Sequence, residues 1–384
     1  MTEVFVVNAG SSSLKYQVVD VESGAAVLNG LVERIGEKGS KAKDVDAAMR
    51  IAIDDLGEGH ELTAVGHRVV HGGTRFTEAT VITDQVEKQI DELSRLAPLH
   101  NPVNLVGIRA ARKALPDVPQ VAVFDTAFHR TLLPEAYTYA LDAALAKRYE
   151  IRRYGFHGTS FKYVAGRTAK FLGRPLADLR MIVLHLGNGA SACAIRGGVS
   201  IDTSMGMTPL EGLVMGTRSG DLDPAILGYL NREAGFEFEH LDAMLNKESG
   251  LLGLTGSGDM RDVQDKATAG DADAEAALAV YCHRIRHYIG AYFAELDGID
   301  ALVFTAGVGE HSMPLREQVL VGFEALGISV DPALNRAGSD AERAISPAGS
   351  PLAVLVIPTN EELEIARQSV AAIRPGASST GSRR

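Results

Sequence analysis

The spacing of apolar residues changes repeatedly between two periods along the first half of the chain. Runs of β-branched residues predict strands, and the first three, separated by polar turns, predict a meander. Segments with apolar residues three and four positions apart predict helices, and Asn101-Pro102 is a suitable cap and first-turn pair for the third. The predicted strands are 3–7, 14–20, 25–33, 64–70 and 119–124, and the predicted helices are 42–56, 83–95 and 102–115. This alternation favours an α/β fold.

The second half of the chain repeats the plan of the first. An apolar strand at 181–186, a glycine turn at 187–190 and a returning strand at 191–196 match the opening strands when Gly10 is laid on Gly187. Further along, the pattern predicts a long helix at 271–297, strands at 301–305 and 353–357, and a closing helix after residue 360. One such match is compatible with chance, but it suggests a duplicated domain.

Composition and charge limit the classes of function. The chain has 384 residues, of which 46% are hydrophobic and 23% charged, so its length predicts two globular domains. Its net charge is -11 and it has no Lys/Arg-rich run, which argues against partners such as nucleic acid or an anionic membrane. An anionic substrate would therefore need basic side chains gathered in a cleft.

Cysteine usage and the N-terminal segment indicate a location. Cys193 and Cys282 lie in apolar runs without a CxxC pattern, as buried free thiols in a reducing compartment would. The N-terminal segment enters a strand without a basic region or cleavage site, and no apolar run reaches membrane-spanning length. We therefore expect a cytoplasmic protein.

Two glycine turns, one in each half, could bind phosphate. Residues 8–15 (NAGSSSLK) place a glycine, three hydroxyls and a lysine between strands, where backbone N–H groups can converge on phosphate oxygens. This is not a Walker loop, and a polar hairpin explains it as well. The matching turn at 186–190 (LGNGA) favours a nucleotide held between two domains.

Several charged residues follow strands or lie in glycine-rich loops, where sites commonly form. Arg68 and Arg218 are suited to bidentate binding of carboxylate and phosphate, although surface ion pairs would also explain them. Asp125 and His157 stand at a strand end and before a helix, where a cap or turn role is the commoner reason. Glu361 could bind a hard cation, or simply provide a favourable acidic first turn. The GVGEH segment after the strand at 301–305 is equally well explained as a tight helix entry.

Taken together, these segments closely resemble the acetate kinase family from about residue 4 to 370. The matching motifs are NAGSSSLKY, GHRVVHGG, APLHNP, VFDTAFH, YGFHGTS, HLGNGAS, DTSMGMTPLEGLVMGTRSGDLDP, TAGVGEH and PTNEE. The resemblance implies two duplicated ribonuclease-H-like domains of the actin-like ATPase type, with a nucleotide cleft between them. It implies domains at 1–149 and 150–362, a closing helix at about 363–374 that returns to the first domain, and a homodimer formed mostly through the second domain. The low apolar content of the last stretch predicts a flexible tail at 375–384.

The resemblance also implies the activity, which is reversible Mg2+-dependent transfer of the γ-phosphoryl group of ATP to acetate, giving acetyl phosphate and ADP. Mn2+ is an alternative metal. The implied catalytic residues are Asp125, His157 and Arg218, and the implied metal positions are Asn8 and Glu361. The implied acetate-binding residues are Arg68, Val70, Leu99, His100, Phe156 and Pro209. The implied nucleotide-binding residues are Ser11, Ser13, Lys15, His185, Leu186, Gly187, Asn188, Gly189, Asp259, Met260, Arg261, Gly307, Val308, Gly309, Glu310 and His311.

Three positions depart from the family pattern. Phe161 stands where histidine is common, Met260 replaces a frequently aromatic residue, and His311 replaces the usual asparagine. The last two leave the nucleotide preference open. Two other functions are compatible with the fold: a kinase that acts on propionate or butyrate, and an actin-like assembly protein without acyl transfer. The second alternative would not need Arg68, Asp125, His157 and Arg218 together.

Overall fold

The computed structural model describes residues 2–10, 12–57 and 59–374, and these fall into two units by the contacts they make. Unit 1 contains the described residues up to Arg130, Gly158–Ser160, and the described residues from Asn360 onward. Unit 2 contains Thr131–His157 and Phe161–Thr359. The contacts thus group residues 131–149 with unit 2. The predicted tail at 375–384 lies outside the described residues.

Unit 1 is built on a mixed six-stranded sheet in the order β3-β2-β1-β4-β6-β5. The predicted meander forms three antiparallel strands, and the two later predicted strands pair in parallel with β1 and with each other. The two-residue strand β5 pairs antiparallel with β6. It is too short to produce a periodic pattern in the sequence. The strands are β1 Glu3–Ala9, β2 Ser13–Asp20, β3 Ala26–Glu33, β4 Leu62–Val69, β5 Thr80–Val81 and β6 Gln120–Phe124.

Unit 2 repeats this topology. Its sheet has the order β11-β12-β10-β7-β8-β9, again with an antiparallel meander, two parallel strands and a short antiparallel edge strand. The strands are β7 Arg180–Leu186, β8 Ala190–Arg196, β9 Val199–Thr203, β10 Ala301–Thr305, β11 Arg343–Ala344 and β12 Ala353–Val356. The duplication suggested by the glycine turns is therefore confirmed across a whole sheet.

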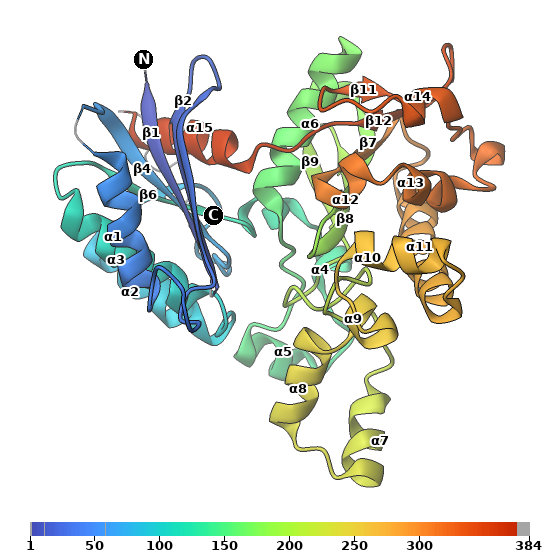
Figure 1. Ribbon diagram of the computed structural model, residues 1–384, viewed down its shortest axis with the longest axis horizontal. Coiled ribbons are helices and arrows are strands. Elements are labelled where there is room, and N and C mark those ends of the chain that lie inside the picture. Colours follow the sequence, from blue (N-terminus) through green and yellow to red (C-terminus); the bar gives the residue numbers. More distant parts are fainter. Residues whose placement is uncertain (1, 11, 58, 375–384) are drawn as a thin grey trace. The chain divides into compact units, whose positions relative to one another are not determined.

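Helices cover both faces of the sheet in unit 1. The closing helix α15 packs on β1, β4 and β6, and Figure 1 shows it beside the blue strands of the N-terminal segment. Gly66 in β4 permits this close packing, because a Cβ there would lie 2.6 Å from Ser369 Oγ in α15. Helices α1 and α3 pack on the same sheet, with α2 against α3. Their bounds are α1 Val45–Leu56, α2 Asp84–Glu92, α3 Asn101–Ala114 and α15 Glu361–Ile373.

The remaining helices follow Arg130, and the long predicted helix is among them. It is α11, which packs on β7 and β8 and buries Tyr281, Ile285 and Ile289. Helix α6 begins with the three residues Gly158–Ser160 that group with unit 1. The bounds are α4 Pro134–Tyr137, α5 Ala143–Tyr149, α6 Gly158–Leu172, α7 Ala225–Ala234, α8 Phe238–Lys247, α9 Gly250–Thr255, α10 Met260–Thr268, α11 Ala272–Glu295, α12 Ala306–His311, α13 Met313–Leu320 and α14 Pro332–Arg336.

The prediction that Asn101 caps α3 is wrong. The residue before the helix is His100, and no side chain caps this end. Asn101 is fully buried, and its amide accepts a hydrogen bond from His71 N at 3.1 Å and donates one to His71 O at 3.0 Å. A buried amide must satisfy its donors and acceptors, and here the loop after β4 supplies them.

Candidate functional site

Arg68 and Asp125 form the centre of a polar cluster in unit 1. Arg68 lies near the end of β4 and Asp125 directly follows β6, and these two strands are parallel neighbours, so their carboxyl ends meet at one edge of the sheet. Arg68 Nη2 donates to Asp125 Oδ2 at 2.6 Å, and Arg68 Nε donates to Oδ1 at 3.0 Å. This bidentate geometry fixes the guanidinium plane.

Asn8 and Glu361 complete the cluster around the same guanidinium. Arg68 Nη1 donates to Asn8 Oδ1 at 3.3 Å, and Glu361 Oε2 lies 3.9 Å from Arg68 Nε. Thr159, in the first turn of α6, donates to Glu361 Oε2 at 3.2 Å. The structure therefore brings together four predicted residues from β1, β4, the end of β6 and α15.

Burial and charge fix the protonation state of Arg68. The Asp125 side chain is 1% exposed and that of Arg68 is 21% exposed. Burial alone would lower the pKa of Arg68, but Asp125 and Glu361 outweigh it and raise the pKa above its ordinary value. Arg68 is therefore a permanent cation, held in place by the Asp125 carboxylate and the Asn8 amide oxygen.

The oxygen atoms of this cluster fit a sparsely held divalent cation. Among the described residues, no group of three or more His, Cys, Asp or Glu side chains could hold a metal by itself. Mg2+, however, commonly binds through one or two protein oxygens and takes its other ligands from substrate phosphates and water. The amide oxygen of Asn8 and the carboxylate of Glu361 meet that need, and both lie at Arg68.

Three further predicted residues of unit 1 lie just after β4 or just before α3. Val70 is buried just beyond β4, and its N–H donates to Asn104 Oδ1 at 3.1 Å. His100 directly precedes α3, and Leu99 beside it is 47% exposed, which leaves an apolar surface uncovered. These positions are compatible with an apolar contact for a small acid.

The first hairpin holds the remaining predicted residues of unit 1. Lys15 is paired with Glu362 of α15, with Nζ 2.5 Å from Oε1, and lies opposite Asn8 in the β1–β2 register. Ser13 begins β2, and its carbonyl accepts a hydrogen bond from Gly10 N at 2.8 Å. Ser11, which was also predicted, lies outside the described residues.

His157 is the centre of a second cluster, in unit 2. It adopts a left-handed conformation with φ of 55° just before α6. Its Nδ1 lies 2.8 Å from Ser191 Oγ, and its ring stacks on His185 with centroids 4.1 Å apart. Sequence reasoning missed Ser191, although it pairs with the predicted His185 in the β7–β8 register.

Arg218 lies beside the same cluster. Its Nη1 donates to Pro209 O at 3.3 Å, and a Cβ built on Gly189 would lie 3.5 Å from Arg218 Nη1 and 3.6 Å from His157 Nε2. The glycine therefore leaves room between two cationic or polar tips. Phe156, the adjacent predicted residue, is buried. A phosphoryl-sized anion could contact both Arg218 and His157 here.

A pocket of about 610 Å3 opens in unit 2. Eight predicted nucleotide residues line it: Gly187, Asn188, Asp259, Met260, Arg261, Gly307, Val308 and His311. Six lining residues were not predicted: Gly216, Leu251, Gly258, Gln264, Tyr281 and Ser312. A pocket of this size with mixed polar and apolar walls suits a small organic ligand.

Five predicted nucleotide residues lie next to the pocket without lining it. His185 and Leu186 end β7, and Gly189 is in the turn after it. Gly309 is buried, with its carbonyl accepting from Arg316 at 2.8 Å, and Glu310 accepts from Thr359 N at 3.1 Å. These contacts stabilise the α12 turn that carries the lining residues Gly307, Val308 and His311.

The three residues that depart from the family pattern occupy defined positions. Phe161 is fully buried and meets the edge of the His185 ring, with centroids 6.3 Å apart. Met260 and His311 both line the pocket. Arg261, on the same wall as Met260, pairs with Asp259 at 2.6 Å, and its hydrogen bonds lower the pKa of Asp259 to about 2.

Known proteins resemble this chain over almost its whole length. A family model described as the acetokinase family matches residues 3–367. An acetate kinase of Leifsonia xyli subsp. xyli is 59% identical, covering 98% of this chain and 100% of the relative, and one of Streptomyces coelicolor is 51% identical, covering 97% of each.

Solved structures agree with the sequence relatives. The crystal structure of Porphyromonas gingivalis acetate kinase matches with a TM-score of 0.92 at 39% identity, covering 97% of this chain and 100% of the other. That of a propionate kinase from Francisella tularensis matches with a TM-score of 0.92 at 40% identity and the same coverage. The predicted fold class is thereby confirmed. In the described residues, no helix is both long and apolar enough to span a membrane.

Proposed function

The chain belongs to the acetokinase family, and from that membership we propose that it catalyses reversible transfer of the γ-phosphoryl group of ATP to acetate, giving acetyl phosphate and ADP. The observation that carries the proposal is the polar cluster of unit 1, where Arg68 is held by Asp125 at 2.6 Å next to Asn8 and Glu361. A fixed guanidinium beside hard oxygen donors is suited to a reaction that joins a carboxylate to a phosphate.

Acetate needs no general base, because it is already ionised at neutral pH. The obstacle is its repulsion from an anionic phosphate, so the protein must supply positive charge and alignment. In our proposal Arg68 binds the acetate carboxylate and Asp125 fixes the orientation of Arg68. Val70, Leu99, His100, Phe156 and Pro209 contact the rest of the acid.

Arg218 and His157 are proposed to stabilise the transferring group. Charge in phosphoryl transfer spreads over the equatorial oxygens, and preorganised donors aimed at those oxygens lower the barrier. Ser191 orients the His157 ring through Nδ1, and Pro209 orients Arg218 through its carbonyl. Transfer is direct and in line, with acetate attacking the γ-phosphorus and ADP leaving.

Family membership implies a divalent metal, and we propose Mg2+, with Mn2+ as the alternative. Asn8 and Glu361 would hold it, because their oxygens meet the sparse protein ligation that this ion accepts. When bound, the ion would neutralise charge on the phosphates of ATP. Ser11, Ser13 and Lys15 would lie near those phosphates.

The pocket of unit 2 is proposed to bind the nucleoside part of ATP and ADP. Its volume of about 610 Å3 and its glycine-rich walls suit a base and sugar, with the turn at 187–189 directed to the phosphates. His185 to Gly189, Asp259 to Arg261 and Gly307 to His311 form the proposed nucleotide-binding segments. Met260 and His311 set the preference among nucleotides.

We propose acetate as the preferred acid and propionate as a poorer one. The structural similarity to a propionate kinase is the reason for including propionate as a substrate. One additional methylene changes binding by only about 1–3 kcal/mol in an apolar pocket, so the two acids should differ in efficiency without either being excluded.

The test is an assay with ATP, Mg2+ and a carboxylic acid in which hydroxylamine traps the acyl phosphate. Acetate should yield hydroxamate, propionate less, and Arg218→Ala should yield about 10²-fold less than the wild type. Product from propionate or butyrate but not from acetate would move the substrate assignment to a longer acid. An absence of product with every acid would instead favour a nucleotide-binding assembly protein.

Four further assignments complete the proposal. The protein acts in the cytoplasm as a homodimer, without nucleic acid or membrane as a partner. Its domains are 1–149 and 150–362, with the closing helix at about 363–374 belonging to the first. The dimer forms through the second domain, where Tyr229, Phe238 and Val280 are exposed apolar side chains. Sedimentation of the purified protein tests the dimer.

A further inference from the structure

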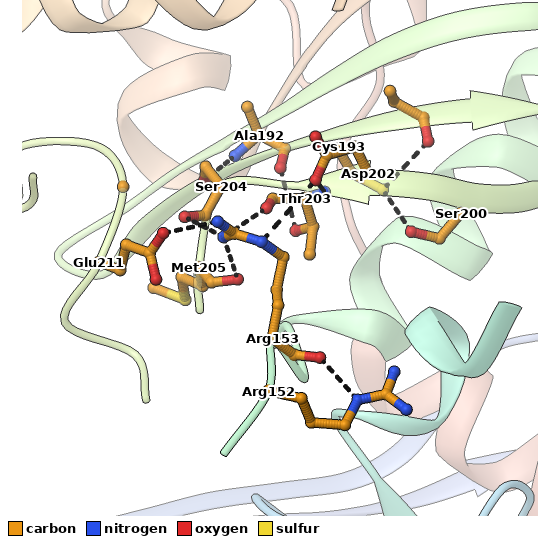
Figure 2. Close-up of polar contacts among 12 residues, drawn as sticks. Arg152, Arg153, Ala192, Cys193, Ser200, Asp202, Thr203, Ser204, Met205 and Glu211 are labelled. Carbon is orange, nitrogen blue, oxygen red and sulfur yellow. Dashed lines mark hydrogen bonds and ion pairs between the residues drawn. The ribbon is translucent and has the colours of Figure 1, made fainter. Parts of the chain in front are cut away.

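Arg153, which no motif singled out, bonds to three successive carbonyls at the start of the 203–211 loop, which begins at Thr203, the last residue of β9. Its Nη1 donates to the carbonyl oxygens of Thr203 at 3.0 Å, Ser204 at 3.2 Å and Met205 at 3.1 Å (Figure 2). Its Nη2 donates to Glu211 at 2.6 Å, near the end of the same loop. One guanidinium thus contacts both ends of the loop.

Neighbouring groups strengthen this attachment. Tyr139 donates its hydroxyl proton to Glu211 and accepts from Met207 N at 3.0 Å. The N–H groups of Tyr154 and Gly155 both bond to Gly206 O, at 3.0 and 3.2 Å. The loop is therefore fixed to the segment 153–155 by side chains and by backbone.

Arg153 is protonated and positively charged. Its side chain is only 17% exposed, and burial alone would lower its pKa, but Glu211 and nearby tyrosine hydroxyls outweigh burial and raise it. Asp202 lies 4.0 Å from Nε on another side. A buried arginine that donates to several carbonyl and carboxylate oxygens holds the segments that carry those oxygens in fixed positions.

One of the two segments that Arg153 joins carries His157, and the other carries the carbonyl that accepts a hydrogen bond from Arg218. The segment that starts at Arg153 continues to Phe156 and His157. The loop at 203–211 contains Pro209, whose carbonyl accepts from Arg218 Nη1 at 3.3 Å. Displacement of this loop would move the acceptor of Arg218 away from His157.

We propose that Arg153 is a positioning residue that sets the distance between His157 and Arg218 by fixing the 203–211 loop to the 153–157 segment. This inference rests on the proposed function, because it assumes that Arg218 and His157 act on the phosphoryl group. In this proposal Arg153 bonds to the loop and does not contact the substrate, which other residues bind.

The test compares Arg153→Ala and Arg153→Lys with a matched control, Arg286→Ala. Arg286 also donates to two carbonyls, those of Val319 and Val321, but these belong to a helix end and its following turn. Arg153→Ala should lower kcat by about 10²-fold, the effect of a displacement near 1 Å, while the affinity for ADP measured by calorimetry stays unchanged. Arg153→Lys, which keeps the charge next to Glu211, should recover part of kcat, and Arg286→Ala should keep it.

Normal kcat in Arg153→Ala would overturn the inference, and so would a parallel loss of kcat and ADP affinity. If Arg153→Ala fails to fold, Tyr139→Phe decides, because it removes only the hydroxyl between Glu211 and Met207. It should lower kcat by about 2- to 10-fold, and a wild-type kcat would contradict the inference. Arg218→Ala is assayed in parallel. If Arg218→Ala keeps the wild-type kcat, both the proposed function of Arg218 and this inference are wrong. If Arg218→Ala is inactive but Arg153→Ala has a normal kcat, only this inference is wrong.

Discussion

His185 occupies in the second hairpin the position that Asn8 occupies in the first. Asn8 pairs with Lys15 across β1 and β2, His185 pairs with Ser191 across β7 and β8, and each pair is one step from the last pair of its hairpin. Duplication has thus placed polar side chains at the same point of both sheets. In unit 2 this point supplies the ring that stacks on His157 and the hydroxyl that bonds to it.

Ser191 should therefore matter for catalysis although it is buried below the site. Ser191→Ala removes the bond to His157 Nδ1 and should lower kcat by about 2- to 10-fold, since a single neutral hydrogen bond is lost. Steady-state kinetics with acetate provide the measurement. Ser200→Ala, a buried serine on β9, is the control. Equal kcat values for Ser191→Ala and the wild type would show that Ser191 does not orient His157.

Asp125 should contribute to stability as well as to catalysis. Its removal leaves the Arg68 cation with weaker partners at a mostly buried position, so Asp125→Ala should lower the free energy of unfolding by up to about 3–5 kcal/mol. Urea unfolding measures the change. The double variant Arg68→Ala/Asp125→Ala should lose less stability than Asp125→Ala, because no lone charge remains. A larger loss in the double variant would contradict this account of the pair.

The sequence predicted this pair more completely than it predicted the surroundings of His157. Arg68 lies near the end of β4 and Asp125 directly follows β6, and parallel neighbours bring the residues at their carboxyl ends to one edge. Ser191 depends on the register of a hairpin, which apolar periodicity does not specify. Tyr281 and Gln264 line the pocket from helices α11 and α10, whose packing is set by tertiary contacts. Asn101 was mistaken for a cap because its buried partner, His71, is remote in sequence.

Glu361 should govern the response to metal. If its carboxylate holds the divalent cation, Glu361→Gln should raise the Mg2+ concentration for half-maximal activity by at least about 10-fold, as loss of a metal-site contact commonly does. Titration of Mg2+ at fixed ATP measures this. Glu364→Gln removes a carboxylate from the same helix, where it bonds to Gln368 at 3.0 Å, and should leave the titration unchanged. Superimposable Mg2+ titration curves for Glu361→Gln and the wild type would show that Glu361 does not bind the metal.

Glu295 should make stability depend on pH. Burial and the neighbouring Asp202 carboxylate raise the pKa of Glu295 to about 7, although Arg153 opposes the shift. The folded protein therefore holds a proton that the unfolded chain releases at lower pH. The stabilisation that this proton gives is complete in acid and is lost as the pH rises through about 7.

Glu295→Gln removes this titration and should raise Tm relative to the wild type at pH 8, with little difference at pH 5. Thermal melts at the two pH values measure the effect. Glu239→Gln, an exposed glutamate on α8, should change neither value. A constant difference between Glu295→Gln and the wild type across this range would show that the Glu295 proton does not contribute to stability.

Val70 should limit the length of the acid. Val70 is buried directly after β4, two residues beyond Arg68, so truncation at this position enlarges the space next to the proposed carboxylate site. A methylene is worth about 1–3 kcal/mol, so Val70→Ala should raise the ratio of kcat/KM for propionate over acetate by about 10-fold. Kinetics with both acids provide the ratio. The matched control is Val69→Ala, because Val69 is the adjacent residue at the end of β4 and is also buried. A rise in the ratio with Val69→Ala but not with Val70→Ala would place the methyl group of acetate next to Val69 instead.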